Sequence, residues 1–297
     1  MTAGPQTTVE DRPVPTPAPA AGPVAARPAE VVSLLYHDVY APADESGPAR
    51  SASGFMTATA APYKLTFEAF EEHLAALAGA GRAAPPLGSM GDLAPGRAPV
   101  LLTFDDGGVS AHSVIAPLLE ARGWRGHFFV VTDEIGRDGF MTADQVRDLH
   151  RRGHVVGSHT CSHPERMSTL SDDELRYEWG HSVAVLSDVL GARVDTASVP
   201  NGYYSRRVGV AAAAAGIRWL FTSEPTLRLT TVAGCTLLGR FHVQAHTPAA
   251  TVADLVAERS VSRARQRLHW SVKKVAKAVG GSGYLAFRSF ALRQRVA

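Results

Sequence analysis

Between residues 100 and 243 short apolar runs alternate with longer amphipathic segments, and this alternation limits the possible folds more than any other feature. The apolar runs predict strands, and the segments between them predict helices because their apolar side chains recur at helical spacing. Alternating strands and helices form a parallel sheet covered by helices, and the number of units here favours a closed or nearly closed barrel. The expected strands are 31–37, 100–106, 126–132, 154–160, 197–202, 219–223 and 236–243, and the expected helices are 67–81, 110–123, 142–153, 171–191 and 205–216.

Composition leaves room for one large domain between two segments of different character. The 297 residues are 45% hydrophobic, which is enough for a large core. Residues 1–30 are rich in Pro and Ala and lack the basic and apolar regions of a secretory signal, so they predict a disordered leader. Residues 259–297 contain seven Arg, three Lys and no acidic residue. We therefore expect a leader at 1–30, a barrel at 31–258 and a basic helical tail at 259–297.

The basic tail carries apolar residues at near-helical spacing between its lysines, which is typical of an amphipathic helix that binds a membrane surface. A solvated helix packed on the barrel fits the same pattern equally well. No aromatic-interleaved motif accompanies the charge, so we expect no nucleic-acid partner. With two cysteines and no membrane-spanning apolar run, we expect a cytoplasmic protein, peripheral to the inner face of the membrane where the tail contacts lipid.

Polar residues gather where the expected strands end, which is where barrels of this kind carry their chemistry. Asp105 and Asp106 follow one apolar strand, and His159 and His163 follow another. Two histidines and one carboxylate suit a divalent metal with open positions, and Asp106 is the natural carboxylate ligand. Cys161 is either a thiolate ligand or small buried filler, and we favour filler.

Two adjacent carboxylates repel each other unless a cation compensates one of them. If Asp106 binds a dication, Asp105 can stay ionised beside it and take a proton from an attacking water. The pair therefore predicts one metal ligand and one general base. A polar turn with solvated carboxylates is the simpler alternative, but such turns rarely follow a strand as apolar as Val100–Phe104.

The motifs TFDDG (103–107) and HTCSH (159–163) together resemble the polysaccharide deacetylases, carbohydrate esterase family four, which are related to the chitooligosaccharide deacetylases. The order of elements resembles that family from about Val31 to Val243. The resemblance implies a distorted (β/α)7 barrel that removes acetyl groups from sugars. It implies Asp105 as the base and a metal held by Asp106, His159 and His163. Zinc is the first expectation for that metal, with cobalt, nickel or manganese as alternatives.

The family's third motif, Arg-x-Pro-x-Gly, is matched only in part by residues 198–202, because Ser198 stands where the family has arginine. The role of that arginine, which orients the catalytic aspartate in relatives, is vacant here or filled from elsewhere. The backbone N–H of Asn201 falls where the family places an oxyanion donor. We also expect Pro200 and Gly202 to lie beside the substrate.

The run LLGRFHV (237–243) resembles the family's fifth motif, which supplies a histidine acid. Period-two alternation puts Arg240 and His242 on one face of this strand. We interpret His242 as the general acid and Arg240 as the replacement for the missing arginine, with His246 as the competing acid. The aspartate-tryptophan motif that supports this histidine in relatives is not recognisable, and Glu224 is a weak substitute. His37, at the end of the first strand, contacts substrate or makes a structural hydrogen bond.

These residues predict a hydrolase that removes N-acetyl groups from an amino sugar in a polysaccharide, oligosaccharide or lipid-linked glycan precursor. The alternative is a barrel that keeps its affinity for metal and sugar but has lost turnover, and that serves as a scaffold or binding subunit. The missing arginine of the third motif and the absent aspartate-tryptophan motif favour the alternative. The intact Asp105 favours the enzyme, because a binding module needs no free base beside a metal ligand.

Overall fold

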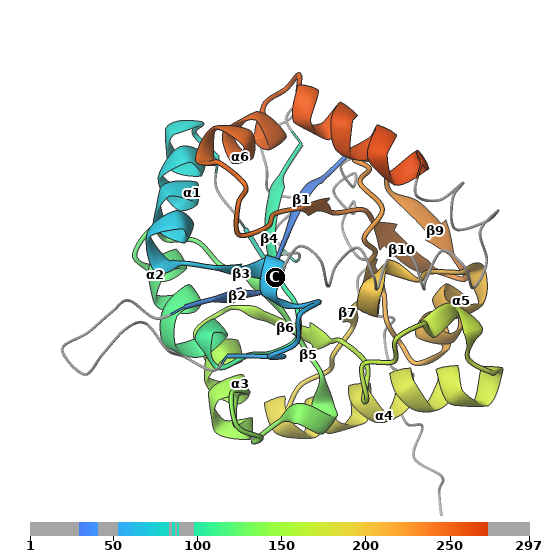
Figure 1. Ribbon diagram of the computed structural model, residues 1–297. Coiled ribbons are helices and arrows are strands. Elements are labelled where there is room, and N and C mark those ends of the chain that lie inside the picture. Colours follow the sequence, from blue (N-terminus) through green and yellow to red (C-terminus); the bar gives the residue numbers. More distant parts are fainter. Residues whose placement is uncertain (1–29, 41–52, 83–84, 87, 89–97, 273–297) are drawn as a thin grey trace, which may run out of the picture.

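The structure, a computed structural model, describes residues 30–40, 53–82, 85–86, 88 and 98–272. Its centre is a strongly curved parallel sheet, and helices surround the sheet on the outside (Figure 1). The predicted leader, except its last residue, and residues 273–297 of the predicted tail lie outside the described residues.

The sheet follows the order β11-β1-β4-β5-β6-β7-β8-β10-β9, so the last parallel strand returns to the first and the sheet curls almost into a ring. All neighbouring pairs are parallel except β9 with β10. The distorted barrel predicted from the sequence is confirmed. The strands are β1 (Val32–Tyr36), β4 (Val100–Phe104), β5 (His127–Val130), β6 (Val155–Ser158), β7 (Thr196–Ser198), β8 (Trp219–Phe221), β9 (Thr230–Val232), β10 (Cys235–Leu238) and β11 (Phe241–His242), with β2 (Asp38–Val39) and β3 (Lys64–Leu65) in a separate small sheet.

One continuous stretch of chain bridges the gap in the ring. Its first part, β10, pairs with β8, and its second part, β11, pairs with β1. The stretch bends between them at Gly239, where a Cβ atom would lie 2.3 Å from the carbonyl oxygen of Glu224. Only glycine allows this close approach, so Gly239 lets the chain pass from one side of the gap to the other. Arg240 follows directly and lies inside the barrel.

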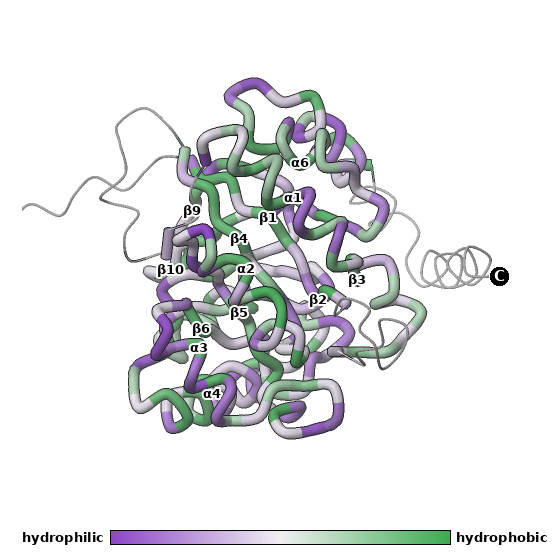
Figure 2. Tube along the Cα trace, turned by 90° about the vertical axis from the view of Figure 1, so that its left-hand side faces the viewer, coloured by the Kyte–Doolittle hydropathy of each residue, from purple (hydrophilic) through white to green (hydrophobic). Residues whose placement is uncertain are grey.

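Four of the helices begin at a hydroxyl cap. The Thr66 hydroxyl accepts from the backbone N–H of Ala69, and the Ser171 hydroxyl accepts from that of Glu174. The buried residues of α1 (Phe67–Gly79) are mainly apolar, including Phe70, Leu74 and Leu77, and they belong to the core cluster on the sheet. Figure 2 colours the chain by hydropathy, and many hydrophilic residues lie towards the outside of the trace. The helices are α1 (Phe67–Gly79), a π-helical turn (Ala111–Ile115) that continues into α2 (Ala116–Glu120), α3 (Ala143–Arg151), α4 (Asp172–Leu190), α5 (Arg206–Ala214) and α6 (Ala249–Val256), with 3-10 turns at Ala61–Tyr63, Thr132–Glu134, Met167–Thr169 and Pro200–Gly202.

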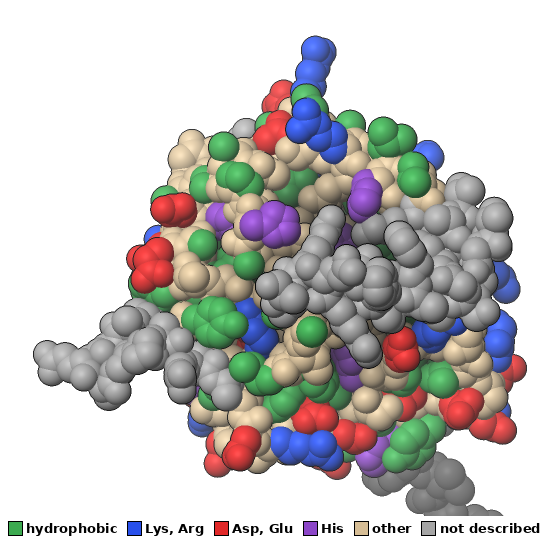
Figure 3. Space-filling view, viewed as in Figure 1, with side chains coloured by type: hydrophobic (Ala, Val, Ile, Leu, Met, Phe, Trp, Pro, Cys, Tyr) green, Lys and Arg blue, Asp and Glu red, His purple; other side chains and the backbone are tan. Residues whose placement is uncertain are grey.

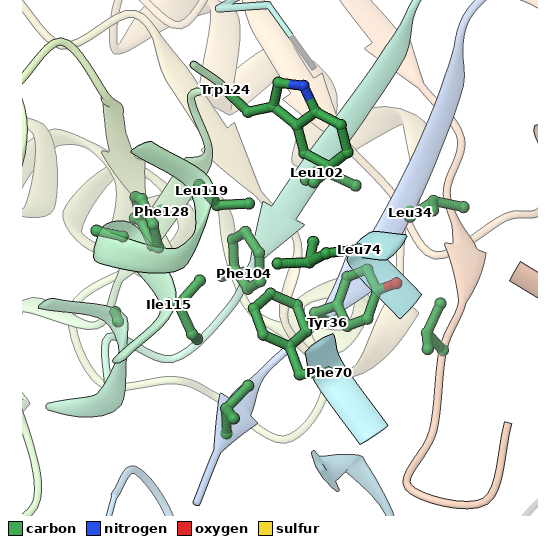
Figure 4. Close-up of a cluster of buried hydrophobic side chains, with 14 of the residues drawn as sticks. Leu34, Tyr36, Phe70, Leu74, Leu102, Phe104, Ile115, Leu119, Trp124 and Phe128 are labelled. Atoms are coloured by element: carbon green, nitrogen blue, oxygen red, sulfur yellow. The ribbon is translucent and has the colours of Figure 1, made fainter. Parts of the chain in front are cut away.

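The main core lies between the outer face of the sheet and the helices. Tyr36 of β1 and Phe104 of β4 stack at a ring distance of 5.6 Å, and Phe70 of α1 meets both rings edge-on (Figure 4). Such aromatic clusters bury large apolar areas and fix the helices on the sheet. A smaller apolar cluster fills the inside of the barrel with Val31, Leu101, Phe129, Phe221 and Leu238. The polar residues discussed below lie at the carboxyl ends of the strands, at the rim of the barrel.

Residues 261–272 form a further helix that packs against the barrel. Arg263 holds its start, because its guanidinium donates to the carbonyl oxygens of Leu255, Ala257 and Glu258. The first part of the predicted tail is therefore docked on the barrel. Among the described residues no helix is long and apolar enough to span a membrane.

Candidate active site

The site forms where β4, β6 and β7 end, as the sequence predicted. Asp105 and Asp106 follow β4, and the chain turns there because Gly107 has a φ of 85°. Gly108 is required for a different reason, since a Cβ atom on it would lie 2.1 Å from Oδ1 of the buried Asp38. Gly107 therefore supplies the left-handed turn, and Gly108 permits close packing against β2 (Asp38–Val39).

Three side chains converge as a possible metal site. Nε2 of His159 lies 3.5 Å from Oδ1 of Asp106, and Nε2 of His163 lies 3.6 Å from the same oxygen. The ligand atoms of the three residues all lie within 4.8 Å of one another. Cys161 is not in this group: its thiol points to the carbonyl oxygens of Tyr177 and Glu178 in α4. The structure therefore places it as buried filler.

The chemistry of these three residues fits a divalent cation. Oδ1 of Asp106 is buried and has no hydrogen-bond partner among the described residues. Burial lowers the pKa of His159 to about 3 and that of His163 to about 4, so both imidazoles are neutral at neutral pH. Burial and the adjacent Asp105 raise the pKa of Asp106 well above its usual value. Two neutral imidazoles and a carboxylate that lacks a partner form a ligand set that a borderline dication satisfies.

A second layer orients His159. Its Nδ1 lies 3.1 Å from the backbone carbonyl oxygen and 2.5 Å from the hydroxyl of Ser198 in β7. A carbonyl oxygen only accepts hydrogen bonds, so this contact places the ring proton on Nδ1 and leaves Nε2 as the free donor of a lone pair.

The backbone of the site is held in conformations that side chains rarely adopt. Among the described residues five non-glycine residues have positive φ, and four of them belong to the site: Asp106 (77°), Thr160 (68°), His163 (54°) and Asn201 (55°). Such residues cost stability and persist only where the surroundings hold them. Because four of the five belong to the site, the surrounding contacts must hold the backbone of the site in these unfavourable conformations.

The turn between the two histidines is held by Glu178 of α4, which the sequence did not point to. Its carboxylate accepts hydrogen bonds from the backbone N–H of Cys161 at 2.9 Å, the backbone N–H of Ser162 at 3.1 Å and the Ser162 hydroxyl at 2.6 Å. Glu178 is buried, and these three donors compensate its charge. The sequence signal is a lone acidic residue on the buried face of a helix, which alone identifies no partner.

Asp105 is held as an ionised carboxylate by three donors. Nη1 of Arg240 donates to Oδ1 at 2.7 Å, Nη2 donates to Oδ2 at 2.9 Å, and the Ser198 hydroxyl donates to Oδ1 at 3.0 Å. Burial opposes ionisation, but the charge of Arg240 outweighs it and lowers the pKa of Asp105 below its usual value. The predicted contact of Arg240 with Asp105 is confirmed. Ser198 is part of the same arrangement, which the sequence did not predict.

His242 lies on the same face of its strand as Arg240. Its Nε2 lies 3.0 Å from the carbonyl oxygen of Ser223, and it is half-buried, whereas His246 is exposed beyond the strand. Asn201 lies in the 3-10 turn directly after β7, between the buried Pro200 and Gly202, which has a φ of 68°. The catalytic and substrate-binding roles of these residues remain predictions.

His37 and Phe55 lie on other sides of the possible metal site. The ring of His37 lies 4.5 Å from that of Tyr63, and its Nδ1 is buried without a hydrogen-bond partner among the described residues. Burial lowers the pKa of His37, while the nearby charge of Asp105 acts in the opposite direction. Phe55, which the sequence did not single out, lies 5.0 Å from the ring of His163. On the face shown in Figure 3 several histidine side chains reach the surface.

The segment that carries Phe55 is fixed by a buried polar cluster. Oδ1 of Asp38 accepts hydrogen bonds from the hydroxyls of Ser53 at 2.5 Å and Ser110 at 2.9 Å, and Oδ2 pairs with Lys64 at 3.3 Å. Lys64 also donates to the carbonyl oxygen of Ser53. Because every partner is buried, this cluster ties residues 53–55 to β2 beside the turn after β4.

Comparison with known proteins agrees with this geometry. Residues 93–220 match a family model described as polysaccharide deacetylase. YxkH of Bacillus subtilis, which is named for the same family, is 27% identical over 134 residues, 45% of this chain and 48% of that protein. Chitin deacetylase 1 of Cryptococcus neoformans is 28% identical over 131 residues, 44% of this chain and 27% of that protein. The chain thus spans about half the length, or less, of these curated relatives.

A solved structure shows the same fold. The Streptococcus pyogenes deacetylase PplD, in complex with acetate, superposes with a TM-score of 0.63 at 19% identity, covering 77% of this chain and 99% of that one. The match extends well beyond residues 93–220. The resemblance drawn from the two sequence motifs is confirmed, and so is the barrel.

Proposed function

We propose that this chain, whose residues 93–220 match the polysaccharide deacetylase family model, is a metal-dependent hydrolase that removes N-acetyl groups from an amino sugar of a polysaccharide, oligosaccharide or lipid-linked glycan precursor. One observation carries the proposal: an ionised Asp105, held by Arg240, lies directly beside a three-residue ligand cluster. A binding site for a metal alone needs no such carboxylate, whereas hydrolysis of an amide needs a base next to the activated carbonyl.

In this proposal Asp106, His159 and His163 hold the cation. A bound divalent cation would polarise the acetyl carbonyl and supply a nucleophile at neutral pH. Zinc suits two imidazoles and one carboxylate, and cobalt, nickel or manganese can occupy the same set.

The remaining steps fall to the protein. Asp105 takes the proton of the attacking water, and Arg240 and Ser198 keep its carboxylate aligned. The backbone N–H of Asn201 donates to the developing oxyanion. His242 protonates the departing amine. Its Nε2 donates to the carbonyl oxygen of Ser223, and this hydrogen bond orients the ring.

The alternative function is a barrel that binds metal and sugar without turnover. One reason to consider it is that Ser198 stands in place of the arginine that orients the catalytic aspartate in relatives. Arg240 and Ser198 now occupy that place around Asp105, which removes the reason to expect a misaligned base. The absent aspartate-tryptophan motif still favours this alternative, because it leaves His242 without the support that relatives give it.

Acetate release separates the two functions. The full chain, reconstituted with zinc, should release acetate from N-acetylglucosamine oligomers, and a chelator should abolish the release. Asp105→Asn should bind zinc and oligomer but release no acetate. Binding of oligomer without acetate release by the unaltered, metal-loaded chain would establish the scaffold function instead.

We also propose that the protein is cytoplasmic and contacts the inner face of the membrane through helix 261–272. Val261, Leu268 and Val272 are 62%, 68% and 59% exposed and lie on the helix face opposite Arg263 and Gln266. Exposed apolar side chains beside arginines favour anionic lipid. The full chain should bind phosphatidylserine vesicles better than phosphatidylcholine vesicles, and less at high salt. A Leu268→Ser, Val272→Ser variant that binds equally well would refute this contact.

A further inference from the structure

Helix 261–272 touches the candidate site through Gln266. The side-chain Oε1 of Gln266 accepts from the backbone N–H of His242 at 2.9 Å, and its Nε2 donates to the carbonyl oxygen of His242, also at 2.9 Å. The side-chain amide thus pairs with β11 as a neighbouring strand would. Gln266 is therefore a positioning residue for His242, supplied from outside the predicted barrel.

Trp270 lies one turn further along the same helix face. Its ring centroid is 6.0 Å from that of His242, with an angle of 34° between the rings. Gly202 is also close to this ring, because a Cβ atom built on Gly202 would lie 3.1 Å from Cη2 of Trp270. Gly202 follows Asn201, and Ser198, four residues before Gly202, contacts Asp105. Trp270 therefore stands at the rim of the site, between the turn after β7 and the end of β11.

We infer that Trp270 forms one wall of the substrate-binding site and packs its indole face against a sugar ring of the substrate. The inference rests on the proposed function and identifies a specificity-determining residue for it. A pyranose ring presents a face of C–H groups, and a flat apolar indole is the side chain that matches such a face over the largest area. Trp270 is only partly buried, so part of this residue reaches the surface beside the site.

The helix has two attachments to the barrel besides Trp270. Arg263 already ties its first turn to the three carbonyl oxygens after α6, and Gln266 ties its middle to β11. The indole sits beyond both attachments, over Gly202, where any larger residue would meet it. The absence of a side chain at position 202 and the presence of an indole above it together shape this side of the site.

The test compares Trp270→Ala, Trp270→Phe and Tyr177→Ala in the full, metal-loaded chain. Tyr177, a 60% exposed aromatic residue of α4 whose ring stacks on His181, is the matched control. With tetra-N-acetylchitotetraose as probe, Trp270→Ala should raise KM about tenfold, the loss of one good aromatic contact, while kcat changes less than about threefold. Trp270→Phe should recover part of the loss, and Tyr177→Ala should match the unaltered chain.

Two results would overturn the inference. One is an unchanged KM in Trp270→Ala. The other is a fall of kcat and of metal content with KM unchanged, which would mean that Trp270 only supports the helix. Direct binding of the tetrasaccharide, measured by calorimetry, keeps the test independent of turnover. If the unaltered chain binds but releases no acetate, the proposed function fails while weaker binding by Trp270→Ala still supports the inference; if the unaltered chain neither binds nor reacts, both fail.

Discussion

Arg240 and Asp105 form a two-pronged ion pair inside the barrel, with Nη1 to Oδ1 at 2.7 Å and Nη2 to Oδ2 at 2.9 Å, although 135 residues separate them in the chain. Nε of Arg240 also donates to the carbonyl oxygen of Thr222 at 3.1 Å. The guanidinium is thus fixed on one side by backbone and presents its planar fork to the carboxylate on the other. This geometry both orients Asp105 and keeps it charged.

Arg240→Lys should therefore lower kcat by about a hundredfold, because an ammonium group cannot reproduce the two-pronged alignment of the base. Metal content should stay at the level of the unaltered protein, since Arg240 contacts no ligand of the cluster. Acetate release and metal analysis measure the two quantities. Arg218→Lys, which alters an exposed pair with Asp195, is the control. Equal loss of metal and turnover would contradict the assignment.

Removal of a metal ligand should instead lower the metal content of the protein. Asp106→Ala and His163→Ala should each weaken zinc binding by more than the roughly 10–100-fold that loss of a second-layer partner costs, because only two protein ligands remain. Asp105→Asn should retain zinc. Metal analysis after dialysis against a weak chelator distinguishes these results. Retention of zinc by His163→Ala with its loss from Asp105→Asn would reverse the roles of base and ligand.

Glu178→Gln should weaken zinc binding by about tenfold, although Glu178 is not a ligand. The amide keeps the size of the carboxylate but offers one acceptor oxygen in place of two, so the donors of Cys161 and Ser162 lose part of their anchor. Titration with a chromophoric chelator measures the affinity. Glu174→Gln, four residues earlier on α4, alters only the helix cap and should bind zinc normally. If Glu178→Gln and Glu174→Gln bind zinc with the same affinity, Glu178 is not needed to hold the turn between His159 and His163.

The acid stability of the protein should depend on His127, which is fully buried. Burial lowers the pKa of His127 to about 4, so the folded state keeps it neutral while the unfolded chain takes up a proton near pH 6.5. The stability it contributes is present above pH 6.5 and is lost as the pH falls from about 6.5 to about 4. His127→Gln should reduce the slope of unfolding free energy against pH in this window by up to about 1.4 kcal/mol per pH unit.

Urea unfolding at several pH values, with a chelator present to remove any contribution from metal release, measures this slope. His181→Gln, at an exposed position on α4, provides the comparison. A His127→Gln slope that matches that of the unaltered protein would show that His127 takes up its proton in the folded state.

Truncation should separate the two halves of the basic tail. A chain that ends at residue 272 keeps Gln266 and Trp270 and should retain its activity on a soluble acetylated oligosaccharide. A chain that ends at Glu258 loses both and should lose most of that activity, because β11 is left without the amide that pairs with His242. Acetate release by the two chains provides the measurement. Full activity after truncation at Glu258 would contradict the docking of this helix at the site.

The local sequence pattern was sufficient to predict where the strands end and which functional side chains lie there. Asp105, Asp106, His159 and His163 could be assigned from sequence because each lies within a few residues of an apolar strand, and parallel strands in a barrel place their ends at one rim. Alternation along residues 237–243 also placed Arg240 on the inner face, since successive side chains of a strand point to opposite sides.

Tertiary structure decided everything that depends on contacts between distant segments. From the sequence, Ser198 indicated only that the arginine of the family motif is missing, because a motif match compares residue types and not contacts. In the structure β4, β6 and β7 are neighbours, and the Ser198 hydroxyl contacts both Asp105 and His159. Glu178 and Trp270 carry no local signal, because a lone acid or a lone indole on a helix acquires a partner only when the helix is placed. The sequence alone determined which residues stand at the rim; the curl of the sheet, closed by the bend at Gly239, decided which of them meet.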